Sequence, residues 1–176
     1  MIDFSKNHFQ LFGLEPAFQL DLARLDQSFR DLQAQVHPDK FSHAPDAERR
    51  LSMQWSTHVN EAYQTLKQPI SRARYLLKLH GVDTQEETNT AMPADFLMEQ
   101  MEWREAIGEA KAAADATELD HLGAKLRQVM HHLQDDIGQR LDQSHDYPGA
   151  AEAVRKLRFL DKLREEINDA LEALEA

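Results

Sequence analysis

The sequence predicts an all-α protein, and three observations carry that prediction. Gly and Pro are scarce, with six of each among 176 residues, whereas the helix-favouring residues Ala, Leu, Glu and Gln are abundant. Apolar residues recur at helical spacing along most of the chain. No stretch shows the sustained apolar and polar alternation, with β-branched enrichment, that is typical of strands.

The first part of the chain predicts a short helix followed by a helical hairpin. The short helix, residues 8–12, ends at Gly13, and the next helix is capped by Asp21. That helix must stop near Pro38, because the residue before a proline is disfavoured in the α conformation. Its apolar stripe comprises Leu22, Leu25, Phe29, Leu32 and Val36. The helix that returns begins near Pro45, and its stripe comprises Leu51, Trp55, Val59, Ala62 and Leu66.

A fourth helix, from Pro69 to a stop at Gly81, completes the first module. The polar, aperiodic residues that follow are typical of a linker. Three longer helices are predicted beyond it, at residues 94–113, 117–143 and 149–175 with a turn at 144–149. Their short connections predict an antiparallel three-helix bundle. The expected organisation is therefore a module over 1–81, a linker over 82–93 and a bundle over 94–176.

Charge divides the chain at the same place and excludes some functions. Residues 1–80 carry a net charge of +1, whereas residues 81–176 carry −12. A total of −11 argues against a nucleic-acid partner, which needs a basic surface. No apolar run approaches about 18 residues, and residues 1–10 lack the features of a signal peptide. We therefore expect a soluble, cytoplasmic protein without a membrane partner.

The connection inside the hairpin reads His37-Pro38-Asp39-Lys40. Proline fixes its own φ and stiffens the tip, and the flanking His and Asp are polar groups that a partner can recognise. Taken alone, the tetrapeptide is more often an ordinary Pro-Asp turn than a recognition site.

In its helical setting this motif resembles a J-domain. The resemblance includes Leu11-Phe12-Gly13-Leu14 before the hairpin and Asn60-Glu61-Ala62-Tyr63-Gln64-Thr65-Leu66 in the returning helix. Two later segments, Phe96-Leu97-Met98-Glu99-Gln100-Met101 and Arg155-Lys156-Leu157-Arg158-Phe159-Leu160-Asp161-Lys162-Leu163, resemble the HscB-type co-chaperones of iron–sulfur cluster assembly. These proteins fuse a J-domain to a C-terminal helical bundle, and the resemblance covers essentially the whole chain.

The resemblance implies a co-chaperone and not an enzyme. Its J-domain would dock on a DnaK-type, HscA-like chaperone and stimulate ATP hydrolysis, with His37, Pro38, Asp39 and Lys40 in contact and Asp39 paired to a chaperone arginine. Basic residues along the second helix usually guide this docking. Here that helix offers only Arg24 and Arg30, interleaved with Asp21, Asp26 and Asp31, and Val36 stands where an aromatic residue commonly precedes the motif.

The first bundle helix has two apolar faces. Phe96, Trp103, Ile107 and Ala110 form the stripe expected to face the bundle core. On the other side lies a second band of Leu97, Met98, Met101, Glu102 and Glu105. The pattern alone leaves open whether this band packs on the J-domain, within a dimer or against another protein. The resemblance implies that it binds the cluster scaffold protein, which is IscU-like, together with Phe159.

A metal-dependent enzyme is the weakest alternative. His131, His132 and Asp135 share one helix, but a third ligand and supporting groups are missing from the pattern, so we predict neither a metal nor another cofactor. No glycine-rich phosphate loop or nucleophile elbow occurs. A general J-protein that serves other clients remains the main rival, because it would share residues 1–80.

Overall fold

The computed structural model describes residues 2–89 and 91–175, and within these ranges the chain is helical with no strand. The all-α prediction is therefore confirmed. Contacts divide the chain into two units, Met1–His80 (unit 1) and Gly81–Ala176 (unit 2). No helix among the described residues is both long enough and apolar enough to cross a membrane.

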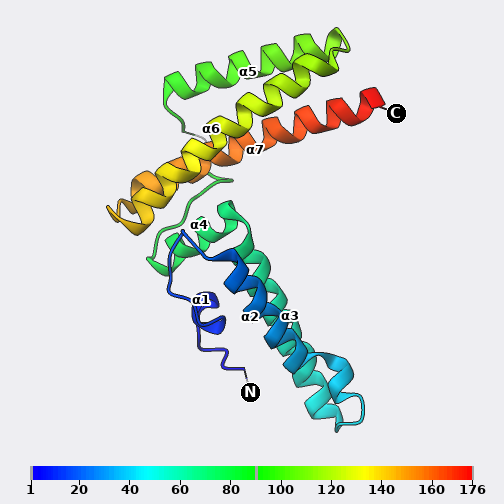
Figure 1. Cartoon of the computed structure of the whole chain (residues 1–176). Helices are drawn as coiled ribbons and strands as arrows, with labels where there is room; N and C mark the ends of the chain where they lie inside the picture. The colour runs from blue at the N-terminus through cyan, green and yellow to red at the C-terminus, as the bar shows by residue number, and fades with distance from the viewer. Residues whose placement is uncertain (1, 90, 176) are drawn as a thin grey trace. The chain divides into compact units, whose positions relative to one another are not determined.

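Unit 1 is built around an antiparallel hairpin of two helices. Its elements are α1 (His8–Leu11), α2 (Leu22–Val36), the 3-10 helix η1 (Pro38–Phe41), α3 (Asp46–Lys67) and α4 (Pro69–Leu79). Figure 1 shows α2 and α3 lying side by side, with η1 at the turn between them. The Asp21 side chain accepts from the Arg24 amide and so caps α2 as predicted.

The core of unit 1 comes from the predicted stripes, with one exception. Its fully buried side chains include Phe9, Leu25, Val59, Leu66 and Leu77. Leu22, which was expected in the stripe of α2, is instead exposed. At roughly 100° per residue it lies about 50° from the centre of the other four positions, at the edge of the stripe.

Unit 2 contains the three long helices α5 (Ala94–Ala112), α6 (Ala116–Asp142) and α7 (Tyr147–Glu175). The longest packing surface joins α6 to α7, and α5 lies along them (Figure 1). The largest buried side chains include Ile107, Leu119, Leu126, Ile137, Leu157, Leu163 and Ile167. They come from all three helices and form the core between them.

The last helix begins two residues earlier than predicted. Tyr147, Pro148 and Gly149 form the first turn of α7 instead of the preceding connection. A proline in the first turn removes an amide that needs no intrahelical partner, and the Asp146 carboxylate accepts from the Gly149 amide at 3.0 Å. A Cβ at Gly149 would overlap Asp146 and Arg140, whose side chains are joined by a 2.6 Å ion pair. This close approach explains the glycine.

Candidate functional site

The tip of the hairpin, His37–Lys40, is a tight polar turn. His37 caps the end of α2 and the start of η1. Its Nδ1 accepts a hydrogen bond from the Asp39 amide at 3.3 Å. The Asp39 carboxylate lies 3.5 Å from the same Nδ1, yet its side chain is 91% exposed. The backbone of the turn is fixed while the charged group points into solvent.

The tip is supported from α3 by a contact that the sequence reasoning missed. The buried Ser52 hydroxyl donates to the Val36 carbonyl at 2.8 Å. Carbonyls in the last turn of a helix have no intrahelical partner, so Ser52 satisfies a group that would otherwise be buried without one. The Phe41 ring packs edge-on against Trp55, with centroids 6.2 Å apart. These contacts hold both ends of the tip against α3.

The two arginines of α2 lie at increasing distance from the tip. Arg30 stands seven residues before His37 and Arg24 thirteen, which at 1.5 Å per residue places their backbones about 10 Å and about 20 Å away. The Arg24 guanidinium donates to the Gly13 carbonyl at 3.1 Å, and the Arg30 guanidinium donates to Gln27 at 3.0 Å. Both side chains are exposed. Both arginines lie along the helix that leads to the tip, and neither forms part of the tip.

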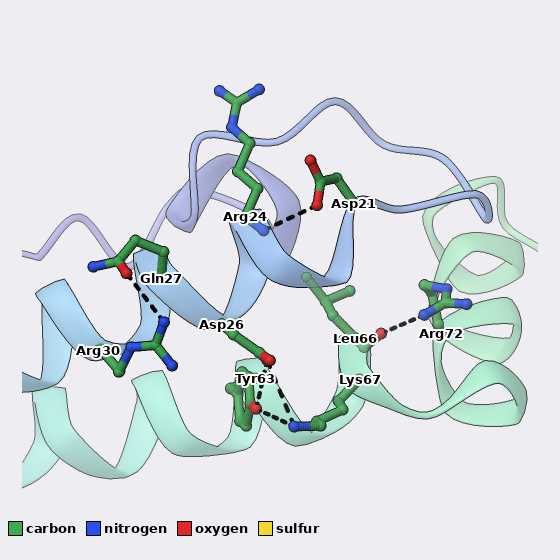
Figure 2. A network of polar contacts seen from close by, with 9 residues as sticks. All are labelled: Asp21, Arg24, Asp26, Gln27, Arg30, Tyr63, Leu66, Lys67 and Arg72. Carbon is green, nitrogen blue, oxygen red and sulfur yellow. Dashed lines mark hydrogen bonds and ion pairs between the residues drawn. The ribbon is translucent and has the colours of Figure 1, made fainter.

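One acidic residue of α2 turns away from this surface. Figure 2 shows Asp26 pointing toward α3, where the Tyr63 hydroxyl donates to its carboxylate at 2.7 Å and Lys67 lies 3.5 Å away. The Tyr63 hydrogen bond, followed by the Lys67 charge, lowers the pKa of Asp26. Contact with Tyr63 and the charge of Asp26 raise the pKa of Lys67. Because the positive charge of Lys67 neutralises the negative charge of Asp26, this carboxylate reduces the positive charge of Arg24 and Arg30 less than the sequence suggests.

On α5 the structure separates the two apolar faces. Phe96, Ile107 and Ala110 are buried and Trp103 is half-buried, whereas Leu97, Met98 and Met101 are 45%, 63% and 71% exposed. Glu102 and Glu105 are exposed in the same band. We call these five residues, Leu97, Met98, Met101, Glu102 and Glu105, the docking face. Methionine adapts its shape readily, so an exposed Met pair on a rigid helix suits a partner's apolar surface.

Phe159 lies at the margin of this face. It is half-buried on α7, and its ring packs edge-on against Phe96 of α5 with centroids 6.3 Å apart. Lys162 Nζ lies 5.9 Å from the centroid of the Phe159 ring. Phe159 therefore contacts Phe96, the residue before Leu97, and the Lys162 ammonium lies beside its ring.

The histidines of α6 remain on the surface. His131 Nε2 lies 3.7 Å from the Asp135 carboxylate, and both side chains are largely exposed. Over residues 2–89 and 91–175, no three His, Cys, Asp or Glu side chains converge in a metal-binding arrangement. The His131–Asp135 contact is an exposed pair on one helix.

Comparisons with known proteins agree with this architecture. Residues 92–168 match the family model described as the HSCB C-terminal oligomerisation domain. The chain is 52% identical over 174 residues to the co-chaperone protein HscB homolog of Aromatoleum aromaticum, covering 99% of this chain and 98% of that one. It is 53% identical over 172 residues to the homolog of Chromobacterium violaceum, covering 98% and 97%.

Two solved structures share the fold over nearly the whole chain. The chaperone HscB from Vibrio cholerae has a TM-score of 0.85 and 38% identity, covering 96% of this chain and 99% of that one. The human co-chaperone HscB has a TM-score of 0.87 and 34% identity, covering 94% and 82%. A hairpin with His-Pro-Asp at its tip, joined to a helical bundle, defines a J-domain co-chaperone, whose partner is a chaperone of the DnaK type. The chain belongs to the HscB family of co-chaperones.

Proposed function

We propose that this co-chaperone stimulates ATP hydrolysis by an HscA-like chaperone through the tip and presents an IscU-like iron–sulfur scaffold protein on the docking face. The observation that carries the proposal is the exposure of Leu97, Met98 and Met101 on a helix whose opposite stripe is buried. A bundle helix normally turns a polar face outward, so this apolar band needs a partner.

On the chaperone side, the exposed Asp39 carboxylate is the strongest recognition group. It pairs with an arginine of the chaperone, because a charge-assisted bond of this kind is strong and directional. His37 and Pro38 hold the turn that presents it, and Lys40 approaches an acidic surface. Arg24 and Arg30 add attraction along α2, which increases the rate of encounter more than the final affinity.

On the scaffold side, the docking face fits an apolar patch flanked by basic residues. Leu97, Met98 and Met101 supply the apolar contact, and Phe159 extends it toward α7. Glu102 and Glu105 stand where basic groups of the scaffold would meet them. The net charge of −12 over residues 81–176 attracts such a partner at long range.

All chemistry belongs to the partners in this proposal. The chaperone hydrolyses ATP in the cytoplasm, the scaffold holds the cluster, and the co-chaperone brings the two together without a cofactor of its own. Because the chain contains no cysteine, it has no thiolate with which to compete for the cluster.

The chaperone half is tested by Asp39→Asn. This change keeps the shape of the side chain and removes its charge, so stimulation of the chaperone ATPase should fall by more than about tenfold. Scaffold affinity, measured by calorimetry, should not change. Asp31→Asn is the matched control, since Asp31 lies on α2 and is already hydrogen-bonded to Gln27. Normal stimulation by Asp39→Asn would contradict the role of the tip.

The scaffold half is tested by alanine at Leu97, Met98 and Phe159 together. Scaffold affinity should fall by at least about tenfold, because a few central apolar residues supply most of the energy of an interface. Stimulation of the chaperone in the absence of scaffold should remain. An unchanged scaffold affinity would favour a general J-protein that serves other clients.

A further inference from the structure

Helix α5 carries one polar side chain on its buried stripe. Gln100 is only 7% exposed, and it stands one turn after Phe96 and two turns before Ile107, both of which are buried. Its amide nitrogen and its amide oxygen are both shielded from solvent, and neither has a hydrogen-bond partner within residues 2–89 and 91–175. Buried polar groups are normally hydrogen-bonded, so this amide requires an explanation.

Gln100 lies where α5 contacts α7. Phe96, four residues earlier, packs on Phe159 of α7 with ring centroids 6.3 Å apart. Arg104, four residues later, lies 3.4 Å from the Glu166 carboxylate of α7. Residues four apart share one side of a helix, so Gln100 stands between these two contacts.

The same position adjoins the docking face. Leu97 precedes Gln100 by three residues, which places it within one turn and about 60° further round the helix. Its side chain is 45% exposed. Glutamine has several rotatable bonds with staggered minima, so a change of rotamer carries its amide from the α5–α7 contact toward the edge that Leu97 forms. The amide is buried in the unbound chain, but it is one side chain away from the surface.

The unpaired amide lowers the stability of the unbound chain. Removing an amide from water without a replacement hydrogen bond opposes folding. Methionine has a similar length and no nitrogen or oxygen to leave unpaired, and its helix propensity is nearly the same. Neither packing nor helix formation therefore favours glutamine at this position. Residues that reduce the stability of an unbound protein are typical of functional sites.

We propose that Gln100 is a binding residue whose amide is paired only in the complex: when the scaffold docks, the amide turns toward Leu97 and hydrogen-bonds the main chain of the scaffold. This role rests on the proposed function, whereas the effect of the unpaired amide on the unbound chain does not.

The chemistry of the amide identifies the kind of segment that it meets. Its oxygen accepts and its nitrogen donates, so a charged side chain satisfies only one of the two atoms. A residue in extended conformation presents its own N–H and C=O to the same side, as it does in a hydrogen-bonded pair of an antiparallel sheet. The segment of the scaffold that lies over Leu97 and Gln100 is therefore an extended one.

Gln100→Met tests both parts of the proposal. The melting temperature of unit 2 should rise by roughly 4–8 °C, because the variant buries no unpaired amide. Affinity for the scaffold of the same bacterium, measured by calorimetry, should fall about five- to fiftyfold, because two hydrogen bonds are lost from the complex. Gln128→Met, at an exposed position of α6, is the matched control and should leave both quantities unchanged.

The two readouts can each overturn the proposal. A higher melting temperature with native affinity would show that the amide is not paired in the complex. A melting temperature at or below that of the native chain would show that the amide does not destabilise the unbound chain. A merely structural glutamine would not give a more stable variant that binds more weakly.

A measurement on the native chain does not depend on the folding of any variant. In a chain labelled with nitrogen-15, the side-chain amide protons of Gln100 should shift downfield when the scaffold is added, since they enter hydrogen bonds. The corresponding protons of Gln128 should not move. Unmoved Gln100 signals in a saturated complex would overturn the proposal.

The failure of the proposed function is distinguishable from the failure of this inference. If the native chain binds no scaffold in calorimetry, the proposed function fails, while the melting temperature of Gln100→Met still tests the unpaired amide. If the native chain binds and Gln100→Met binds equally well, only the role of Gln100 is lost.

Discussion

The tip of unit 1 and the docking face of unit 2 are both exposed, but for different physical reasons. The tip is a polar turn whose Asp39 carboxylate points into solvent while η1 and Ser52 hold its backbone. The docking face is an apolar surface on a regular helix, and its rigidity comes from the buried stripe on the other side of α5. One site is built for a directional charged contact and the other for burial of area.

This difference separates what each site needs from the rest of the molecule. A polar tip requires exact backbone placement, so it depends on a few hydrogen bonds between α2 and α3. An apolar face requires only that its helix stay in place, so single changes on it should alter binding without altering the fold. The first three of the four predictions below test that contrast, and the fourth concerns the stability of unit 1.

The largest effect is expected for Met101→Asp. It places an additional carboxylate in the centre of the docking face, where a bound partner leaves it unpaired, and should weaken scaffold binding ten- to a hundredfold, about 1.4–2.8 kcal/mol. The melting temperature should hardly change, because Met101 is 71% exposed. Calorimetry with the scaffold measures the first and circular dichroism the second. Gln128→Asp, an equal charge change on exposed α6, is the control, and equal weakening by both variants would exclude a local role for the face.

Ser52→Ala should instead lower the stability of unit 1 and leave scaffold affinity unchanged. Removing the hydroxyl leaves the Val36 carbonyl buried without its partner, which costs about 1–2 kcal/mol and lowers the melting temperature of unit 1 by roughly 5–10 °C. Because Val36 immediately precedes His37, chaperone stimulation should fall as well, while scaffold affinity stays constant. The exposed neighbour Thr57→Ala should match the native chain in both assays, and a Ser52→Ala variant of native stability would show that the contact contributes little.

Salt should distinguish the two sites to a smaller degree. Raising salt from 50 to 300 mM screens the exposed charges of Asp39, Arg24 and Arg30, so the concentration needed for half-maximal chaperone stimulation should rise about threefold. Scaffold binding, which depends more on apolar contact, should change less over the same range. Greater salt sensitivity of scaffold binding would instead assign the main role there to Glu102 and Glu105.

The smallest effect is a pH dependence confined to unit 1. Burial, and then repulsion from His58, lower the pKa of His8, with Lys78 acting in the same direction and Glu61 against it. His8 stacks on Tyr75 with centroids 4.3 Å apart. As the pH falls below about 6.5, the unfolded chain therefore binds more protons at His8 than the native chain, and stability is lost.

The phenylalanine variant His8→Phe keeps the ring stack and removes this titration. Between pH 7.5 and 5.5 its melting temperature should fall by on the order of 2 °C less than that of the native chain. His43→Phe, at an exposed position of the same unit, should follow the native chain. Parallel pH curves for His8→Phe and the native chain would exclude His8 as a source of the acid sensitivity.

The sequence by itself determined the helices and the two faces of α5. Helical periodicity, Asp21 as a cap and the prolines at 38 and 69 act within one or two turns, so local rules are sufficient to place them. The same periodicity put Leu97, Met98 and Met101 opposite Phe96 and Ile107, and their exposure agrees. Resemblance supplied the partners, and the roles of these residues in binding remain proposals.

Only the tertiary structure decided which polar groups meet across helices. Ser52 and the Val36 carbonyl are 16 residues apart, Tyr63 and Asp26 are 37 apart, and Arg155 and Thr84 are 71 apart. A serine, tyrosine or arginine has the same local pattern whether it faces solvent or a distant carbonyl, because hydrogen-bond partners depend on how helices pack and not on their period. The support of the tip and the contact between Arg155 and Thr84 therefore became visible only when the helices were assembled.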